Sequence, residues 1–257
     1  MAVRITFEFV DCFTELQRVP NRPCESGRES LAFPLANLPS EGRQMMAVYR
    51  PGPGRPQDDR WTIACYDGIA REYAARWEDW QPADLPTFCS SLPAGARVAD
   101  VGCGPGRDLD FLLRSGLSAV GLDLSSTMLD VARDRPALRS RLARSDMRAL
   151  PLRSASLEGI ACIAAFLHIP KRSTANVLDE FRRALSPGGQ RLVVTQQGAA
   201  EEYRPHEQGG RRFYALYTAD ELTSLLAGHG FDIGDTRSAL DDRRDGIAWI
   251  TVFAQRR

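Results

Sequence analysis

The chain has 257 residues, with 33 basic and 33 acidic side chains and a formal net charge of zero at pH 7. This balance argues against tight binding to a nucleic acid backbone, which requires a basic face. Hydrophobic residues make up 43% of the chain and charged residues 26%, which is ordinary for a soluble globular protein. The composition therefore excludes a mainly disordered, collagenous or membrane-spanning protein.

The cysteines and the N-terminal sequence indicate a reducing compartment. Six cysteines are scattered without a C-x-x-C pair, so we predict free thiols and no metal site. Arg4, Glu8 and Asp11 interrupt any apolar run long enough for a secretion signal. No stretch approaches the roughly 18 apolar residues that a membrane helix requires. We therefore expect a cytoplasmic protein without a membrane partner.

Residues 1–60 differ from the remainder of the chain. Alternating apolar residues from Val3 to Phe9 have the pattern of a strand, but the segment after Val19 is rich in proline and lacks periodicity. We interpret residues 1–60 as a proline-rich leader of uncertain order and residues 61–257 as the functional domain. A start site placed too far upstream, with Met45 or Met46 as the true one, is the alternative.

From residue 61 onward, short apolar runs alternate with helical patterns. Strands are predicted at residues 97–101, 118–122, 141–144, 158–165, 191–195, 231–235 and 247–254. Helices are predicted at residues 69–77, 85–92, 177–185 and 218–228, through Leu109, Leu112 and Leu113, and through Met128, Leu129 and Ala132. Ser125 and Thr218 are the expected N-caps of two of these helices. Strands that alternate with helices indicate an α/β fold with a parallel, doubly wound sheet covered on both faces.

The first predicted strand of this region runs into a glycine loop. Gly102, Gly104 and Gly106 allow the backbone to approach a ligand closely, as at a nucleotide-cofactor site. Arg107 occupies the position of the third glycine in the dinucleotide pattern G-x-G-x-x-G, which argues against NAD and FAD. Asp123 follows the next strand, where a carboxylate can accept hydrogen bonds from two ribose hydroxyls.

The segment Val98-Ala99-Asp100-Val101-Gly102-Cys103-Gly104-Pro105-Gly106 closely resembles the glycine loop of class I S-adenosylmethionine-dependent methyltransferases. The resemblance extends over about residues 66–255. It includes Ser145-Asp146-Met147, the strand end Ala164 to Pro170, and the turn Leu185-Ser186-Pro187-Gly188-Gly189. The segment from Tyr66 to Tyr73 resembles the helix that covers the cofactor in this family.

The resemblance implies a Rossmann-like, mostly parallel seven-stranded sheet with an antiparallel last strand, and S-adenosyl-L-methionine as the cofactor. Asp146 is then expected near the adenine amine and Met147 against the ring, while Asp100 supports the loop and the methionine amine. The full set of implied cofactor-binding residues is Tyr66, Tyr73, Asp100, Gly102, Gly104, Gly106, Asp123, Leu124, Asp146, Met147 and Ala164.

His168 is the candidate catalytic base. It follows the fourth predicted strand, at the edge where open α/β sheets bind ligands, and an unperturbed imidazole titrates near neutrality. The alternative is that His168 only shapes the pocket. The resemblance also implies an acceptor-binding region after the fifth strand, and the expected substrate-binding residues are His168, Arg204, Tyr214 and Tyr217. The surrounding aromatic residues fit a small hydrophobic core equally well.

Neutral charge favours a small-molecule acceptor with an O, N or C nucleophile and argues against nucleic acid as a partner. The chain also lacks the Asn/Asp-Pro-Pro-Phe/Tyr motif of base and glutamine-amine methyltransferases. Two alternatives remain open: a tRNA or protein methyltransferase, and a non-catalytic protein that binds S-adenosylmethionine. We expect a monomer or a homodimer.

Overall fold

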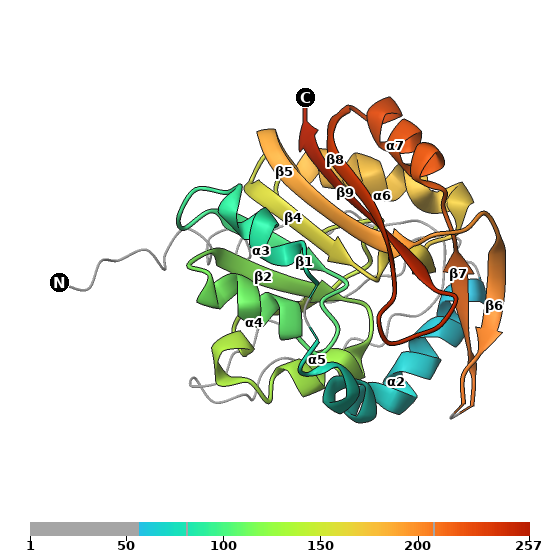
Figure 1. The fold of residues 1–257 in the computed structure, drawn as a ribbon. Coiled ribbons are helices and arrows are strands. Elements are labelled where there is room, and N and C mark those ends of the chain that lie inside the picture. The colour runs from blue at the N-terminus through green and yellow to red at the C-terminus, as the bar shows by residue number, and fades with distance from the viewer. Residues whose placement is uncertain (1–56, 81, 208) are drawn as a thin grey trace, which may run out of the picture.

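A computed structural model describes residues 57–80, 82–207 and 209–257. A seven-stranded sheet with the order β3-β2-β1-β4-β5-β9-β8 occupies its centre (Figure 1). The strands are β1 (Arg97–Val101), β2 (Ser118–Asp123), β3 (Leu142–Arg144), β4 (Leu157–Ile163), β5 (Leu185–Gln196), β8 (Phe231–Leu240) and β9 (Ala248–Arg256). Strands β1 to β5 run parallel, and β9 is antiparallel to both of its neighbours. The predicted mostly parallel sheet with an antiparallel last strand is confirmed.

Helices cover both faces of the sheet because successive side chains of a strand point to opposite sides. Val98 packs in one buried cluster with Leu109 and Leu112, whereas the adjacent Ala99 belongs to a second cluster with Phe181. The helices are α2 (Gln57–Trp77), α3 (Leu85–Ser90), α4 (Arg107–Arg114), α5 (Ser126–Ala132), α6 (Lys171–Ala184) and α7 (Ala219–Gly228), with 3-10 turns η2 (Pro136–Leu138) and η3 (Phe166–His168).

Both predicted N-caps are confirmed. The Ser125 hydroxyl accepts a hydrogen bond from the backbone N–H of Met128 at 3.1 Å, and the Thr218 hydroxyl accepts one from Glu221 at 3.2 Å. Each cap satisfies a backbone donor that has no partner within its helix. The cap at Ser125 fixes the start of α5 immediately after Asp123, so it also fixes the chain at the end of β2.

The structure differs from the sequence prediction at several elements. Helix α6 begins at Lys171 rather than at residue 177, and β5 begins at Leu185 rather than at residue 191, so β5 includes the segment expected as a turn at residues 185–189. Helix α2 begins at Gln57 rather than at residue 69, and β8 continues to Leu240 rather than ending at residue 235. A two-stranded hairpin, β6 (Glu201–Pro205) paired with β7 (Arg211–Ala215), was not predicted. Its strands are rich in charged residues, and charged residues hide the alternation by which an isolated strand is recognised.

The hairpin lies beyond the main sheet and contacts α2 (Figure 1). The Thr62 hydroxyl on α2 accepts a hydrogen bond from the backbone N–H of Phe213 on β7 at 2.9 Å. We call α2 (Gln57–Trp77) and the hairpin (Glu201–Ala215) together the roof. Apart from the last four residues, which lie in α2, the expected leader falls outside the described residues, as does the strand expected from Val3 to Phe9.

Four cysteines fall within the described part of the chain, Cys65, Cys89, Cys103 and Cys162, and all four are free thiols. Among the helices that the structure describes, none has both the length and the apolar character needed to cross a membrane.

Candidate active site

A cavity of about 440 Å³ lies where the parallel strands end. Residues that follow β1 to β5 line it, because the carboxyl ends of parallel strands meet at one edge of a sheet. Side chains of the roof complete the wall. Binding sites for small ligands typically enclose roughly 300–1,000 Å³, so the cavity has the size of such a site.

The glycine loop forms one side of the cavity for steric reasons. Gly102 has φ +80°, and a Cβ built there would lie 2.2 Å from the Cβ of Ala165. Gly104 has φ +51° and lines the cavity, and a Cβ there would contact no protein atom within 4 Å. The backbone at Gly104 is thus open to a ligand.

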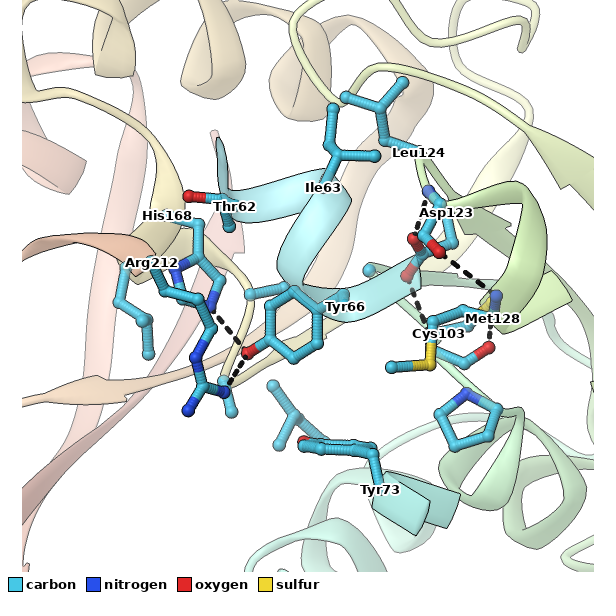
Figure 2. Close-up of a pocket in the computed structure, with 18 of the residues that line it drawn as sticks. Thr62, Ile63, Tyr66, Tyr73, Cys103, Asp123, Leu124, Met128, His168 and Arg212 are labelled. Carbon is cyan, nitrogen blue, oxygen red and sulfur yellow. Dashed lines mark hydrogen bonds between the residues drawn. The ribbon is translucent and has the colours of Figure 1, made fainter. Parts of the chain in front are cut away.

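Asp123 is held at the end of β2 by the loop that it faces (Figure 2). Its Oδ2 accepts a hydrogen bond from the backbone N–H of Gly104 at 2.8 Å, and its Oδ1 accepts one from Ser125 at 2.8 Å. Burial raises the pKa of Asp123, and these backbone donors oppose that shift. Each oxygen keeps a second lone pair, so the carboxylate can accept two hydroxyl groups from the cavity. Leu124 lies beside it in the wall.

Asp146 lies in the wall after β3 and is paired with Arg148. Its Oδ2 accepts from Arg148 Nη2 at 2.7 Å and its Oδ1 from Arg148 Nε at 2.9 Å. Arg148 also donates to the buried Asp59 of α2. The expected adenine-binding acid is therefore part of an ion-pair network that links the sheet edge to the roof. Met147 lies in the same wall.

Two of the expected cofactor-binding residues do not line the cavity. Gly106 is the N-cap of α4, and a Cβ there would lie 2.4 Å from Leu138, so packing requires this glycine. Asp100 is 1% exposed, and its Oδ2 has no hydrogen-bond partner. Burial and the nearby Asp108 raise the pKa of Asp100 well above its usual range. Neither residue lines the cavity, so we propose no direct contact between them and a ligand.

An aromatic row on α2 faces the cavity. Tyr66 and Tyr73 have ring centroids 5.6 Å apart, and Tyr73 and Trp77 have centroids 6.3 Å apart. Spacings of seven and four residues place these side chains on one face of a helix. Trp77, Trp80 and Trp249 also line the cavity but were not predicted. The helical spacing identifies Trp77 in retrospect, whereas Trp249 reaches the site only through the position of β9.

His168 is hydrogen-bonded at both ring nitrogens. Nδ1 lies 2.6 Å from the carbonyl oxygen of Phe213. Nε2 lies 2.9 Å from the Tyr66 hydroxyl (Figure 2). A carbonyl oxygen only accepts, so Nδ1 carries the proton and Nε2 accepts from Tyr66. Arg212 Nη1 in turn donates to the Tyr66 oxygen at 3.2 Å. Burial lowers the pKa of His168 to about 4.

The expected substrate-binding residues divide into two groups. Tyr214 lines the cavity, with its ring centroid 5.1 Å from that of His168. Arg204 lies against the Tyr214 ring at 4.5 Å and donates to Gln196 at 2.8 Å, outside the cavity wall. Tyr217 is 1% exposed, and its hydroxyl is hydrogen-bonded to Thr174 at 2.8 Å. Neither Arg204 nor Tyr217 lines the cavity, so we do not propose them as substrate ligands.

The sequence matches known methyltransferases. Residues 98–189 match the family model described as "Methyltransferase domain". The methyltransferase GfsG of Streptomyces halstedii is 37% identical, over 63% of this chain and 62% of its own length. The ubiquinone biosynthesis O-methyltransferase of Xylella fastidiosa is 34% identical, over 64% of this chain and 76% of its own length.

Another relative is much longer than this chain. The mouse tRNA (carboxymethyluridine(34)-5-O)-methyltransferase ALKBH8 is 29% identical over 69% of this chain, but that match spans only 26% of ALKBH8. Among solved structures, the 1,6-didemethyltoxoflavin-N1-methyltransferase of Burkholderia thailandensis has a TM-score of 0.65 and 18% identity, and the match covers 81% of this chain and 93% of that one. This likeness supports the fold.

The chain belongs to the class I S-adenosylmethionine-dependent methyltransferases. The described residues fit the cofactor of this family. The open backbone at Gly104, the spare lone pairs of Asp123 and the aromatic row on α2 lie around one cavity. In the described part of the chain, no group of three or more His, Cys, Asp or Glu side chains is placed to hold a metal ion.

Proposed function

We propose that this protein transfers the methyl group of S-adenosylmethionine to a small molecule bound beneath the roof. One observation carries this proposal: a single cavity has the glycine loop and Asp123 on one side and the polar set Tyr66, His168 and Arg212 on the other. The two sides of the cavity therefore offer polar groups to two different molecules, a cofactor and an acceptor.

S-adenosylmethionine supplies a methyl group on a sulfonium, which is already a strong electrophile. The contribution left to the protein is positioning, and a well-oriented pair of reactants gains up to about 7–11 kcal/mol relative to free reactants. We propose that Asp123 binds ribose hydroxyls and that Asp146 and Met147 contact the adenine. Tyr66, Tyr73 and Tyr214 then enclose the reacting atoms and exclude water.

We propose His168 as a positioning residue. Its only lone pair accepts the Tyr66 proton, and its lowered pKa makes it a weak base near neutral pH. The imidazole fixes the Tyr66 hydroxyl, which Arg212 contacts from the other side. This interpretation develops the pocket-shaping alternative, and the base role remains the competing prediction.

The similarity to ALKBH8 supports a second candidate, methylation of a tRNA nucleotide. The neutral charge of this chain favours the small molecule, since phosphate contacts depend on basic residues. A methyl-transfer assay with labelled S-adenosylmethionine, run in parallel on a metabolite extract and on bulk tRNA, distinguishes the two candidates. Label in tRNA alone would overturn the small-molecule proposal.

Asp123→Asn tests whether Asp123 binds S-adenosylmethionine. The amide keeps the shape of the carboxylate but replaces one acceptor oxygen with a donor, which also opposes the backbone N–H groups that Asp123 now accepts. A hydrogen bond to a charged group contributes about 1.5–3 kcal/mol to binding. Because one such bond is lost, we expect S-adenosylmethionine to bind about 10- to 100-fold more weakly, as measured by calorimetry. The exposed Asp134→Asn variant is the matched control. Equal affinity of both variants and the unmodified protein would contradict the assignment.

A further inference from the structure

Among the arginines that line the cavity, one is partly buried and has no acidic partner in the described part of the chain. Five arginines line the cavity: Arg76, Arg107, Arg148, Arg212 and Arg244. Arg107 is paired with Asp108 at 2.8 Å, Arg148 with Asp146 at 2.7 Å, and Arg244 with Asp241 at 2.5 Å. Arg76 is exposed to solvent. Arg212 is partly buried, and within the described residues it forms no ion pair.

The surroundings of Arg212 hold its guanidinium toward the cavity. Its carbon Cζ lies 5.0 Å from the Tyr66 ring centroid and 5.9 Å from that of Tyr214. Nη1 donates to the Tyr66 hydroxyl, and the buried Nε has no partner in the part of the chain that the structure describes. Figure 2 shows the side chain beside Tyr66 and His168. A desolvated cation with unused donors is unfavourable unless an anion binds to it.

The carboxylates in the cavity wall do not meet this requirement. Asp59 and Asp146 are bound to Arg148, Asp108 is bound to Arg107, and Asp123 accepts from backbone N–H groups. Glu72 and Glu207 also line the cavity but are exposed side chains. The donors of Nη1 and Nη2 that Tyr66 does not use are therefore available to a ligand, and the planar guanidinium matches the geometry of a carboxylate.

The same residues restrict the class of nucleophile that the site can methylate. A phenol, alcohol or protonated amine must lose a proton during methylation, and this requires a base. The nearest nitrogen base, Nε2 of His168, already accepts the Tyr66 proton. A carboxylate is ionised at neutral pH and needs no base. An anionic oxygen nucleophile therefore fits both the unpaired cation and the occupied imidazole.

We propose that the acceptor is a small carboxylic acid, bound as its carboxylate by Arg212 and methylated on a carboxylate oxygen. This inference rests on the proposed function and specifies its substrate class. The carboxylate oxygen forms a bond to the methyl carbon as the sulfur–methyl bond breaks, and the electron pair of the broken bond stays on sulfur. The products are a neutral methyl ester and S-adenosylhomocysteine, and no proton is released.

The test uses the full chain with methyl-labelled S-adenosylmethionine. A protein-free metabolite extract is divided by anion exchange into an acidic fraction and a neutral-to-basic fraction, and each is incubated with enzyme. We expect label from the acidic fraction only, in a product that releases labelled methanol under mild alkali, as methyl esters do. Label that resists alkali, or that arises from the neutral-to-basic fraction, would overturn the carboxylate proposal but leave methyl transfer intact. No label from either fraction would instead count against the proposed function.

Variants then assign the carboxylate to Arg212. With the acidic fraction as substrate, we expect Arg212→Gln to raise the acceptor KM by about 10- to 100-fold, because a charged hydrogen bond to the acceptor is lost. Arg212→Lys, which keeps the charge but not the fork, should lie between Arg212→Gln and the unmodified enzyme. Arg71→Gln removes an exposed arginine from the same roof and serves as the control. Retained thermal stability and unchanged S-adenosylmethionine affinity show that each variant is folded. An unchanged acceptor KM in a folded Arg212→Gln variant would refute the role of Arg212.

Discussion

At the scale of single residues, His168 shows how two hydrogen bonds fix a protonation state. Phe213 offers only an acceptor to Nδ1, so the proton stays on that nitrogen and Nε2 is left to accept from Tyr66. A second proton on the ring would put a positive charge into a buried position with the Arg212 cation nearby. The site therefore requires a neutral imidazole.

This requirement predicts acid sensitivity. The pKa of His168 is lowered from 6.5 to about 4 in the folded protein, so between these values the unfolded chain binds more protons. The stabilisation is fully present above pH 6.5 and is lost as pH falls from 6.5 to 4. We expect a loss of about 2 kcal/mol from this residue between pH 7 and pH 5.

Urea unfolding at pH 7 and pH 5 measures the effect. His168→Asn keeps a donor and an acceptor but does not titrate, so its free energy of unfolding should fall less between the two pH values than that of the unmodified protein. A parallel fall in both proteins would show that the imidazole does not carry the sensitivity.

At the scale of elements, the roof was harder to predict than the sheet edge. The glycine loop and Asp123 follow predicted strands, and their place at one edge follows from parallel strand order. The first half of α2 shows no apolar stripe that would mark it as a helix, and tertiary contacts such as Asp59 with Arg148 and Thr62 with Phe213 stabilise it. Such contacts join residues that are far apart in the chain, so no local sequence pattern predicts them.

Asp59→Asn tests how α2 is attached. The Asp59 side chain is 5% exposed, and its replacement by a neutral amide leaves Arg148 with Asp146 as its remaining ionic partner, which removes the charged contact between α2 and the sheet edge. We expect faster hydrogen exchange across α2 and an S-adenosylmethionine affinity lowered by about 3- to 10-fold, because part of the cavity wall is then less ordered. Arg71→Gln breaks an exposed ion pair between α2 and Asp134 and should change exchange little. Unaltered exchange in Asp59→Asn would show that other contacts hold the helix.

At the scale of the whole molecule, the two buried clusters on either side of the sheet account for the predictable part of the fold. Parallel strands buried on both faces are continuous apolar runs, which is why their places were found from the sequence. Two charged side chains that are 1% exposed interrupt these runs in the described strands, Asp100 on β1 and Arg191 on β5. Arg191 on β5 is 1% exposed, and its three guanidinium nitrogens lack hydrogen-bond partners in the described structure. The Phe231 ring, 4.1 Å from its Cζ, is its nearest aromatic contact.

Replacing this arginine should stabilise the protein. Burial lowers the pKa of Arg191 to about 9, which reports the unfavourable environment of the cation. Arg191→Met fills similar space without a charge, and comparable replacements of buried charges by apolar residues gain about 1–4 kcal/mol. Thermal unfolding should therefore show a Tm higher by about 2–4 °C for each kcal/mol gained. A lower Tm would mean that the contact with Phe231 outweighs the desolvation of the cation.

The separation of the roof from the sheet edge has a consequence for how this protein diversifies. The groups assigned to the cofactor belong mostly to strand ends, where packing restricts them, as at Gly102 beside Ala165. The groups assigned to the acceptor belong mostly to α2 and the hairpin, which lie outside the main sheet. We therefore expect substitutions in the hairpin to change the molecule that is methylated while the source of the methyl group stays the same. In evolutionary terms, we expect the hairpin to vary more than the sheet edge and the face of α2 that lines the cavity.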